Sequence, residues 1–206
     1  IRRGRAAATR TGRWDSPAYS DTTGGLLDRY ARELGRRVRG RIAGVPGTGS
    51  KWGVWRVEEQ LIDPGMDLLI CEFAVNDGSA SDPVPADWRG QVVGTMEGIV
   101  RKTLAKNPRT AIVFVYVSDK PMLNTCLKGA VPQSIVAHHQ VAKHYGIPEV
   151  YLSPVCAQGV AEGVVKSHNL FPDGCHPSAL AGRCYGEFLA NAIRTAAEWK
   201  APAEPP

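Results

Sequence analysis

An aspartate and a histidine near the C-terminus are spaced for acid–base chemistry. Asp173 precedes His176 by three residues in the segment Phe171-Pro172-Asp173-Gly174-Cys175-His176-Pro177. A carboxylate and an imidazole this close in a turn can hydrogen-bond, so the carboxylate fixes the imidazole tautomer while the other ring nitrogen acts as a general base. The pair would supply two of the three side chains of a nucleophilic triad.

Two further stretches could supply hydrogen-bond donors to a developing negative charge. The segment Gly44-Val45-Pro46-Gly47-Thr48-Gly49-Ser50 is rich in glycine, so its backbone N–H groups can approach an oxyanion closely. Asn76 follows residues 67–75, whose first half is almost unbroken apolar, and we expect the tip of a buried strand to hold its side-chain amide. Taken singly, these features also fit an ordinary loop, a turn-forming asparagine and a satisfied polar histidine.

Alternating elements would position these three stretches. Hydrophobic periodicity predicts helices over residues 26–38, 54–62, 92–104, 133–145 and 180–193, and strands over 41–45, 67–75, 111–117 and 149–152. Strands alternating with helices predict a three-layer α/β/α sandwich with a parallel, flavodoxin-like sheet. Ligands of such sheets bind beyond the carboxyl ends of the strands, so the loops at Gly47, Asn76 and Asp173 should converge on one site.

Length and composition favour one globular domain. The 206 residues are 43% hydrophobic and 22% charged, so we expect a single domain over residues 1–200 and a flexible Pro-rich tail over 201–206. The longest apolar run, 111–117, is far shorter than the roughly 20 residues that span a bilayer. We therefore expect no membrane span.

Charge and cysteine usage exclude other classes of protein. The net charge of +5 is matched by five arginines among the first thirteen residues, without the aromatic or zinc patterns typical of nucleic-acid arms. We interpret this segment as a solvated one and expect no nucleic-acid partner. The five cysteines include no C-x-x-C pair, which predicts buried or partly buried free thiols and no metal site.

The motifs, in this order, resemble those of the SGNH hydrolases, also called the GDSL esterase family. Gly47 matches the oxyanion glycine of that family, and Asp173 and His176 match its C-terminal Asp-x-x-His block. Ala74-Val75-Asn76-Asp77 matches the Gly-x-Asn-Asp block, with Ala in place of Gly. The resemblance covers residues 26–193.

The nucleophile block of the family, Gly-Asp-Ser, does not occur in the sequence. Ile1-Arg2-Arg3-Gly4 resembles the residues that follow the family's serine, so we expect the nucleophile, the first strand of the sheet and any signal peptide to precede Ile1. Ser16 is the competing nucleophile, although no apolar strand precedes it. Ser20 is a poorer candidate, and we expect Ser50 to cap the helix that follows it.

The resemblance implies hydrolysis of carboxylic esters, of acetyl or short acyl groups, through an acyl-enzyme intermediate and without a cofactor. In this interpretation His176 is the general base, Asp173 orients it, and Gly47 and Asn76 form the oxyanion hole. The expected substrate is a small-molecule or carbohydrate ester; the sequence indicates neither the oligomeric state nor the cellular compartment, which could be the cytoplasm or the exterior.

Two alternatives stay open at this point. Residues 44–51 approach the Walker A phosphate loop of nucleotide-binding proteins, but Ser50 and Lys51 stand in the reverse order. A catalytically inactive carbohydrate-binding relative could use some of the five tryptophans to stack on sugar rings, although we expect Trp52 and Trp55 to pack in the core. His138, His139 and His144 are predicted to be helix residues and His168 a surface loop residue.

Overall fold

The computed structural model describes residue 32, residues 38–78 and residues 86–198. The helix predicted over 26–38, the tail 201–206, Ile1 and the serines Ser16 and Ser20 lie almost entirely outside this part of the chain, with only Arg32 seen as helical. The elements, in chain order, are α2 (Ser50–Gln60), β1 (Leu68–Cys71), α3 (Ala74–Gly78), α4 (Trp88–Lys106), β2 (Ala111–Tyr116), α5 (Lys120–Leu127), α6 (Gln133–Tyr145), β3 (Glu149–Tyr151), α7 (Leu152–Ala161), α8 (Ser167–Leu170) and α9 (Ala179–Glu198).

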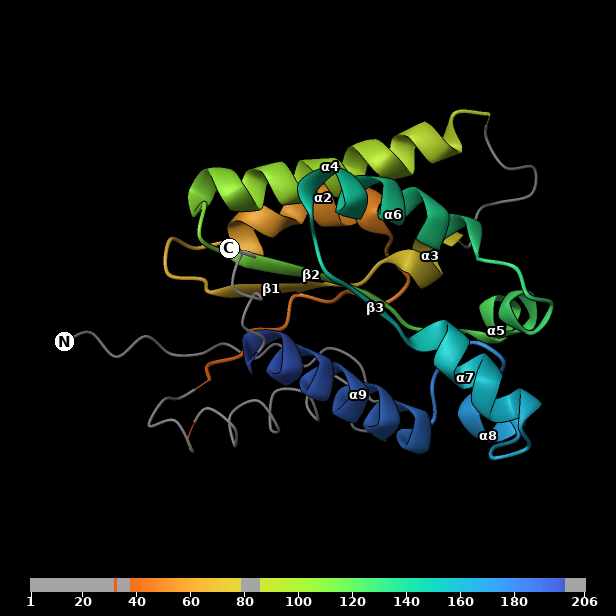
Figure 1. Ribbon diagram of the computed structural model, residues 1–206. Coiled ribbons are helices and arrows are strands. Elements are labelled where there is room, and N and C mark those ends of the chain that lie inside the picture. Colours follow the sequence, from red (N-terminus) through yellow and green to blue (C-terminus); the bar gives the residue numbers. More distant parts are fainter. Residues whose placement is uncertain (1–31, 33–37, 79–85, 199–206) are drawn as a thin grey trace, which may run out of the picture.

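The three described strands form a parallel sheet in the order β1-β2-β3. Leu68 pairs with Ala111 at one end of the first ladder, and Tyr116 pairs with Tyr151 at the end of the second. The connections from β1 to β2 and from β2 to β3 pass through α4 and α6, which lie on the same face of the sheet (Figure 1). The predicted α/β class with a parallel sheet is therefore confirmed.

Strand β2 is buried on both faces, because side chains alternate along a strand and each face is covered by helices. Ile112, Phe114 and Tyr116 join a core that includes Val57 of α2, Met96 and Val100 of α4, and Ile135 and Val141 of α6. Val113, Val115 and Val117 join a second core with residues of α5, α7 and α9, among them Leu123, Leu152 and Leu189. Figure 1 shows the resulting layers, with α2, α4 and α6 above the sheet and α9 below it.

Several sequence predictions are wrong in detail. Residues 41–45 form no strand: Ile42 is 66% exposed, and the carbonyl oxygen of Ala43 accepts a hydrogen bond from the guanidinium of Arg56 instead of a strand neighbour. Strand β1 ends at Cys71, so Asn76 lies in the short helix α3 and not at a strand tip. The helices α5, α7 and α8 were not predicted, and His168 belongs to α8, although it is exposed as expected.

Other side chains also depart from expectation. Trp52 and Trp55 are 62% and 75% exposed, because α2 turns Gly53 and Val57 towards the core and leaves the tryptophans on its outer face. Ser50 does not cap α2; its hydroxyl hydrogen-bonds to Thr95 in α4.

The cysteines fit the prediction only in part. Cys71 and Cys156 are buried and Cys126 is partly buried, whereas Cys175 and Cys184 are exposed. None of the helices in the described ranges combines the length and apolar character of a membrane span.

Candidate active site

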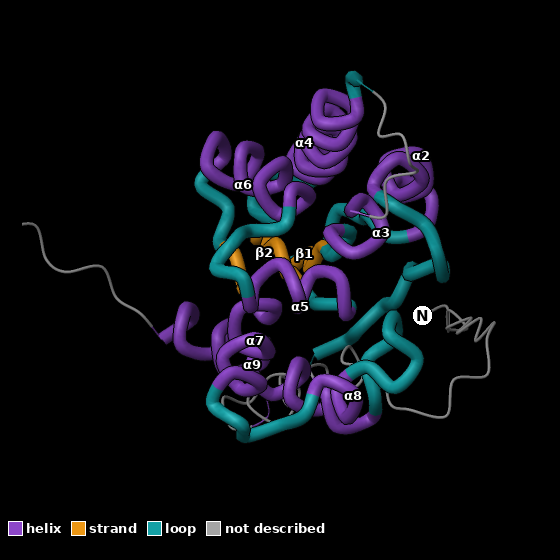
Figure 2. The backbone as a smooth tube through the Cα atoms, turned by 90° about the vertical axis from the view of Figure 1, so that its right-hand side faces the viewer, coloured by secondary structure: helices purple, strands orange, loops and turns teal. Residues whose placement is uncertain are grey.

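The carboxyl ends of all three strands meet at one end of the molecule. Figure 1 shows β1 leading into α3, β2 into α5 and β3 into α7 at this end, and Figure 2 views the molecule from it. We call this end the carboxyl rim. The segments that the sequence singled out reach it from three directions.

The aspartate and histidine near the C-terminus are joined directly. Asp173 Oδ2 lies 2.7 Å from His176 Nδ1, and Asp173 Oδ1 accepts hydrogen bonds from the backbone N–H groups of Cys175 and His176 at 2.9 and 2.7 Å. The hydrogen bond from the imidazole, followed by those from the two backbone N–H groups, holds the pKa of Asp173 well below its usual range. An ionised Asp173 only accepts hydrogen bonds, so the proton of the ring lies on Nδ1, and Nε2 is the ring nitrogen that can accept a proton.

The fold places this turn beside the end of β2. The backbone N–H of Lys120, the first residue of α5, donates to the carbonyl oxygen of Gly174 at 3.2 Å. Gly174 has a φ of +82°, a conformation that glycine adopts without strain, and this allows the tight turn between the aspartate and the histidine. Phe171, just before the turn, is buried in the core beneath the sheet and anchors the segment.

Cys175, next to His176, does not have the environment of a nucleophile. Loss of hydration, together with the negative charges of Asp119 and Asp173, raises the pKa of its thiol. A nucleophilic cysteine needs the opposite influence, a positive neighbour that favours the thiolate.

The loop that precedes α2 packs against Asn76. Pro46 and Gly47 form a turn in which Gly47 has a φ of +67°, and the hydroxyl of Thr48 donates to the carbonyl oxygen of Val45 at 2.7 Å. A Cβ atom on Gly49 would lie 3.6 Å from the backbone carbonyl carbon of Asn76. The glycine loop and the exposed Asn76 are therefore neighbours on the carboxyl rim.

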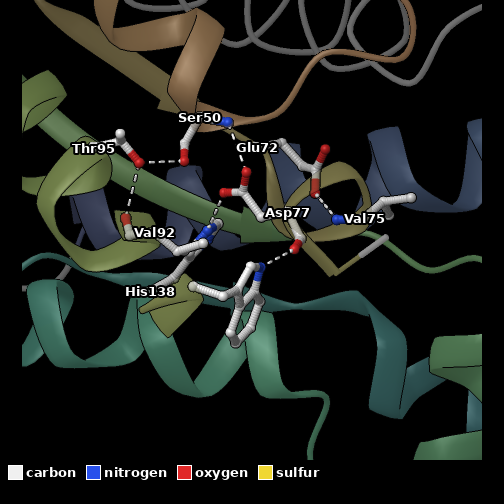
Figure 3. Close-up of polar contacts among 8 residues, drawn as sticks. Ser50, Glu72, Val75, Asp77, Val92, Thr95 and His138 are labelled. Atoms are coloured by element: carbon white, nitrogen blue, oxygen red, sulfur yellow. Dashed lines mark hydrogen bonds and ion pairs between the residues drawn. The ribbon is translucent and has the colours of Figure 1, made fainter. Parts of the chain in front are cut away.

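Asp77 holds these two segments together, and the sequence did not single it out as a functional residue (Figure 3). Its Oδ1 accepts from the backbone N–H of Ser50 at 2.7 Å, and its Oδ2 lies 2.8 Å from Nε2 of His138 in α6. The signal for this contact was present in the sequence, because His138 occupies a position on the same helix face as Ile135 and Ala142. A polar residue on an apolar face indicates a buried partner.

A second carboxyl group, the partly buried Glu72, follows β1 directly. Burial, with a smaller contribution from the negative charges of Asp77 and Asp119, raises the pKa of Glu72 to about 7, against the opposing effect of backbone N–H groups that hydrogen-bond to it. Glu72 Oε1 accepts one of these bonds from Val75 in α3. This carboxyl group shapes the turn between β1 and Asn76.

Serine side chains among the described residues do not offer an evident nucleophile. Four of the six, Ser50, Ser118, Ser134 and Ser153, are buried, and the hydroxyl of Ser178 accepts the backbone N–H of Ala181 at the start of α9. The glycine loop is also unlike a phosphate-binding loop, because no strand leads into it and Lys51 is exposed.

Comparison with known proteins identifies the fold. No protein-family model matches the chain, and no curated protein sequence matches it. A solved two-domain esterase, CEX, active on acetylated mannans, superposes with a TM-score of 0.70 at 23% identity, over 92% of this chain and 46% of that chain. The chain thus spans less than half of that esterase.

Two further solved structures are similar over most of their own length. Axe2, an acetylxylan esterase from Geobacillus stearothermophilus, superposes with a TM-score of 0.64 at 20% identity, over 92% of this chain and 84% of that one. The acetyl xylan esterase AlAXEase superposes with a TM-score of 0.64 at 12% identity, over 83% and 90% of the two chains. The chain has the fold of these esterases.

Proposed function

We propose that this protein hydrolyses carboxylic esters, with acetyl groups on carbohydrates as the substrate class. The observation that carries the proposal is the hydrogen-bonded pair of Asp173 and His176, in a turn that is bonded to the start of α5 at the carboxyl rim. The esterases that share this fold act on acetylated mannans and acetylated xylan, which supports a carbohydrate ester as substrate.

In the proposed mechanism a serine hydroxyl attacks the carbonyl carbon of the ester. His176 Nε2 takes the proton of the hydroxyl, and Asp173 stabilises the imidazolium that forms. Collapse of the tetrahedral intermediate breaks the bond to the alcohol oxygen, which receives the proton from His176. Water then attacks the carbonyl carbon of the acyl-enzyme and gives a proton to His176. The second tetrahedral intermediate collapses, the bond to the serine oxygen breaks, and the serine takes the proton back from His176 as the carboxylic acid is released.

The oxyanion of each tetrahedral intermediate needs preorganised donors. We assign this role to the backbone N–H of Gly47 and the side-chain amide of Asn76, each worth on the order of 3 kcal/mol of activation free energy in comparable enzymes. Two observations support this assignment: the glycine loop packs against Asn76, and the backbone N–H of Ser50 donates to Asp77.

The test is acetate release from acetylated xylo- and mannooligosaccharides by the intact protein. Asn76→Ala should lower kcat by about 100- to 1000-fold, because it removes one oxyanion donor. Asn191→Ala, at an exposed position of α9, is the matched control and should leave kcat unchanged. An unchanged rate for Asn76→Ala would remove Asn76 from the mechanism.

The nucleophile is identified by covalent labelling. A serine-directed fluorophosphonate should label the intact protein at one serine, and peptide mass mapping then distinguishes Ser16 from a serine that precedes Ile1. Labelling should disappear in His176→Ala, because the imidazole activates the hydroxyl.

One observation favours a second candidate function. Trp52 and Trp55 lie one helical turn apart on the exposed face of α2, where their rings could stack on sugars. Binding of xylo- or mannooligosaccharides without any acetate release by the intact protein would favour an inactive carbohydrate-binding relative.

A further inference from the structure

The carboxylate of Asp77 connects two segments that are far apart in the sequence. Its Oδ1 accepts from the N–H of Ser50, 27 residues upstream, and its Oδ2 lies 2.8 Å from Nε2 of His138, 61 residues downstream. Both side chains of the pair are removed from solvent, with exposed fractions of 1% for His138 and 5% for Asp77. The carboxylate can therefore find its hydrogen-bond donors only within the protein.

The backbone of Asp77 is fixed as firmly as its side chain. Its N–H donates to the carbonyl oxygen of Phe73 at 2.8 Å, and its own carbonyl oxygen accepts from the indole N–H of Trp88 at 3.1 Å. Asn76 precedes Asp77 directly, so these bonds also determine where Asn76 stands on the carboxyl rim. Figure 3 shows Asp77 between Ser50 and His138.

The contact with the glycine loop is close. The ideal Cβ position of Gly49 lies only 2.3 Å from Asp77 Oδ1, so only a residue without a side chain fits beside the carboxylate. Ser50 is held from its other side as well, because its hydroxyl lies 2.6 Å from that of Thr95, which donates to Val92. The start of α2, and with it the loop that carries Gly47, is thereby set against α3.

His138 holds the carboxylate in this orientation. Nε2 of His138 lies 2.8 Å from Oδ2, where its N–H can donate to the carboxyl group, while Oδ1 is directed at the N–H of Ser50. The imidazole is itself fixed against the sheet, with its ring centre 6.3 Å from that of Phe114 and 5.9 Å from that of Tyr116, both in β2. The packing of His138 against β2 therefore fixes the carboxylate of Asp77 relative to the core, and not relative to the glycine loop.

We propose that His138 is a positioning residue, which acts through Asp77 to hold the two oxyanion donors, Gly47 and Asn76, at a fixed separation. Asp77 is covalently bonded to Asn76, and its carboxylate is hydrogen-bonded to Ser50, at the end of the segment that carries Gly47. The inference rests on the proposed function, because it takes Gly47 and Asn76 as the oxyanion donors. It adds a residue in α6 that touches neither the substrate nor the reacting atoms.

The experiment compares two nearly isosteric replacements in the intact protein. In His138→Gln the side-chain amide can still donate to Asp77, whereas in His138→Met no donor remains. With an acetylated oligosaccharide as substrate, His138→Met should lower kcat per folded molecule by about 10- to 100-fold, because a misplacement of about 1 Å costs that much, while KM changes less than 3-fold. His138→Gln should retain more than a third of the wild-type kcat.

A purely structural role predicts a different pattern. The Gln and Met variants would then lose thermal stability while kcat per folded molecule stayed at the wild-type value, and this result would overturn the proposal. Equal losses of kcat in the two variants would overturn it too. His144→Met, at an exposed position of the same helix, is the control and should match the wild type in both readouts.

A readout without turnover separates this inference from the proposed function. Amide hydrogen exchange of Ser50 should be slow in the wild type and in His138→Gln, and at least 10-fold faster in His138→Met. If His138→Met does not fold, amide exchange in the wild type still tests the proposal. A Ser50 amide that exchanges as fast as that of Gly47 would contradict it. An intact protein without esterase activity but with a protected Ser50 amide would refute only the proposed function.

Discussion

Gly49→Ala tests the coupling between the glycine loop and Asp77 most sharply. The added Cβ atom would lie 2.3 Å from Asp77 Oδ1, so the two must move apart by about 1 Å to reach ordinary contact near 3.4 Å. Such a movement stretches the 2.7 Å bond between Ser50 N and Oδ1 beyond hydrogen-bonding distance. The loop that carries Gly47 must then shift relative to Asn76.

The expected loss of stability has two parts. A buried hydrogen bond to a charged acceptor contributes about 1.5–3 kcal/mol, and the strain of an extra methyl group in a packed site costs roughly 1–3 kcal/mol. We therefore expect Gly49→Ala to lower the free energy of unfolding by about 2.5–6 kcal/mol. A misplacement of about 1 Å should also lower kcat by roughly 100-fold in the molecules that remain folded.

The assay combines urea denaturation with acetate release by the intact protein. Gly44→Ala is the control, because nothing lies within 4 Å of its added Cβ atom and its φ is not positive. It should change the free energy of unfolding by less than about 1 kcal/mol, since only the flexibility of the unfolded chain is reduced. Equal stability and equal kcat for the two variants would refute the coupling of the loop to Asp77.

Two further predictions concern the carboxyl groups near the site. Asp173→Asn should lower kcat by about 100- to 10000-fold, because an amide no longer enforces the tautomer of His176; a kcat within 3-fold of the wild type contradicts the role of Asp173. Glu72→Gln should change the pH dependence of stability. The pKa of Glu72 is raised from 4.5 to about 7, so the folded state keeps a proton that the unfolded state releases. The bound proton therefore favours the folded state, and its contribution to stability is fully present below pH 4.5 and is lost as the pH rises to 7. At 1.36 kcal/mol per pKa unit the wild type loses up to about 3 kcal/mol over this range, whereas Glu72→Gln should not; parallel curves in urea denaturation at pH 4.5 and pH 8 would contradict the assignment.

The sequence predicted best the elements with strong local signals. Helix α6 has the predicted bounds, because apolar residues recur along it and Gly146, with a φ of +65°, ends it. Strand β2 was predicted because its continuous apolar run fits a strand covered on both faces. These signals are local and need no knowledge of the partner elements.

The elements that were missed depend on weaker or distant information. Helix α5 is short, and its best signal is a cap, since Asp119 accepts the backbone N–H of Met122 and Pro121 stands in the first turn. The strand predicted over residues 41–45 has the right composition, but none of the described strands lies beside it to bond its backbone. Pairing is a property of the whole sheet and not of the five residues.

The contacts of the candidate site also fall into local ones, which the sequence predicts, and long-range ones, which it does not. The bond between Asp173 and His176 joins residues three apart, so spacing was sufficient to predict it. The contact of Asp77 with Ser50 and His138 joins residues separated by 27 and 61 positions. The apolar face of α6 indicates that His138 has a buried partner, but it does not say which residue that partner is. The exposure of Trp52 and Trp55 likewise depends on which face of α2 meets α4.

We propose that the three segments of the carboxyl rim form one acyl-transfer site. A crystal structure of the intact protein with a phosphonate bound to its reactive serine tests this directly. We expect the phosphonyl oxygen to lie about 2.7–3.1 Å from the backbone nitrogen of Gly47 and from Nδ2 of Asn76, with His176 Nε2 in hydrogen-bonding reach of the serine oxygen. An adduct whose phosphonyl oxygen is bound by other groups, with Asn76 and His176 remote from it, would show that these segments do not form one site.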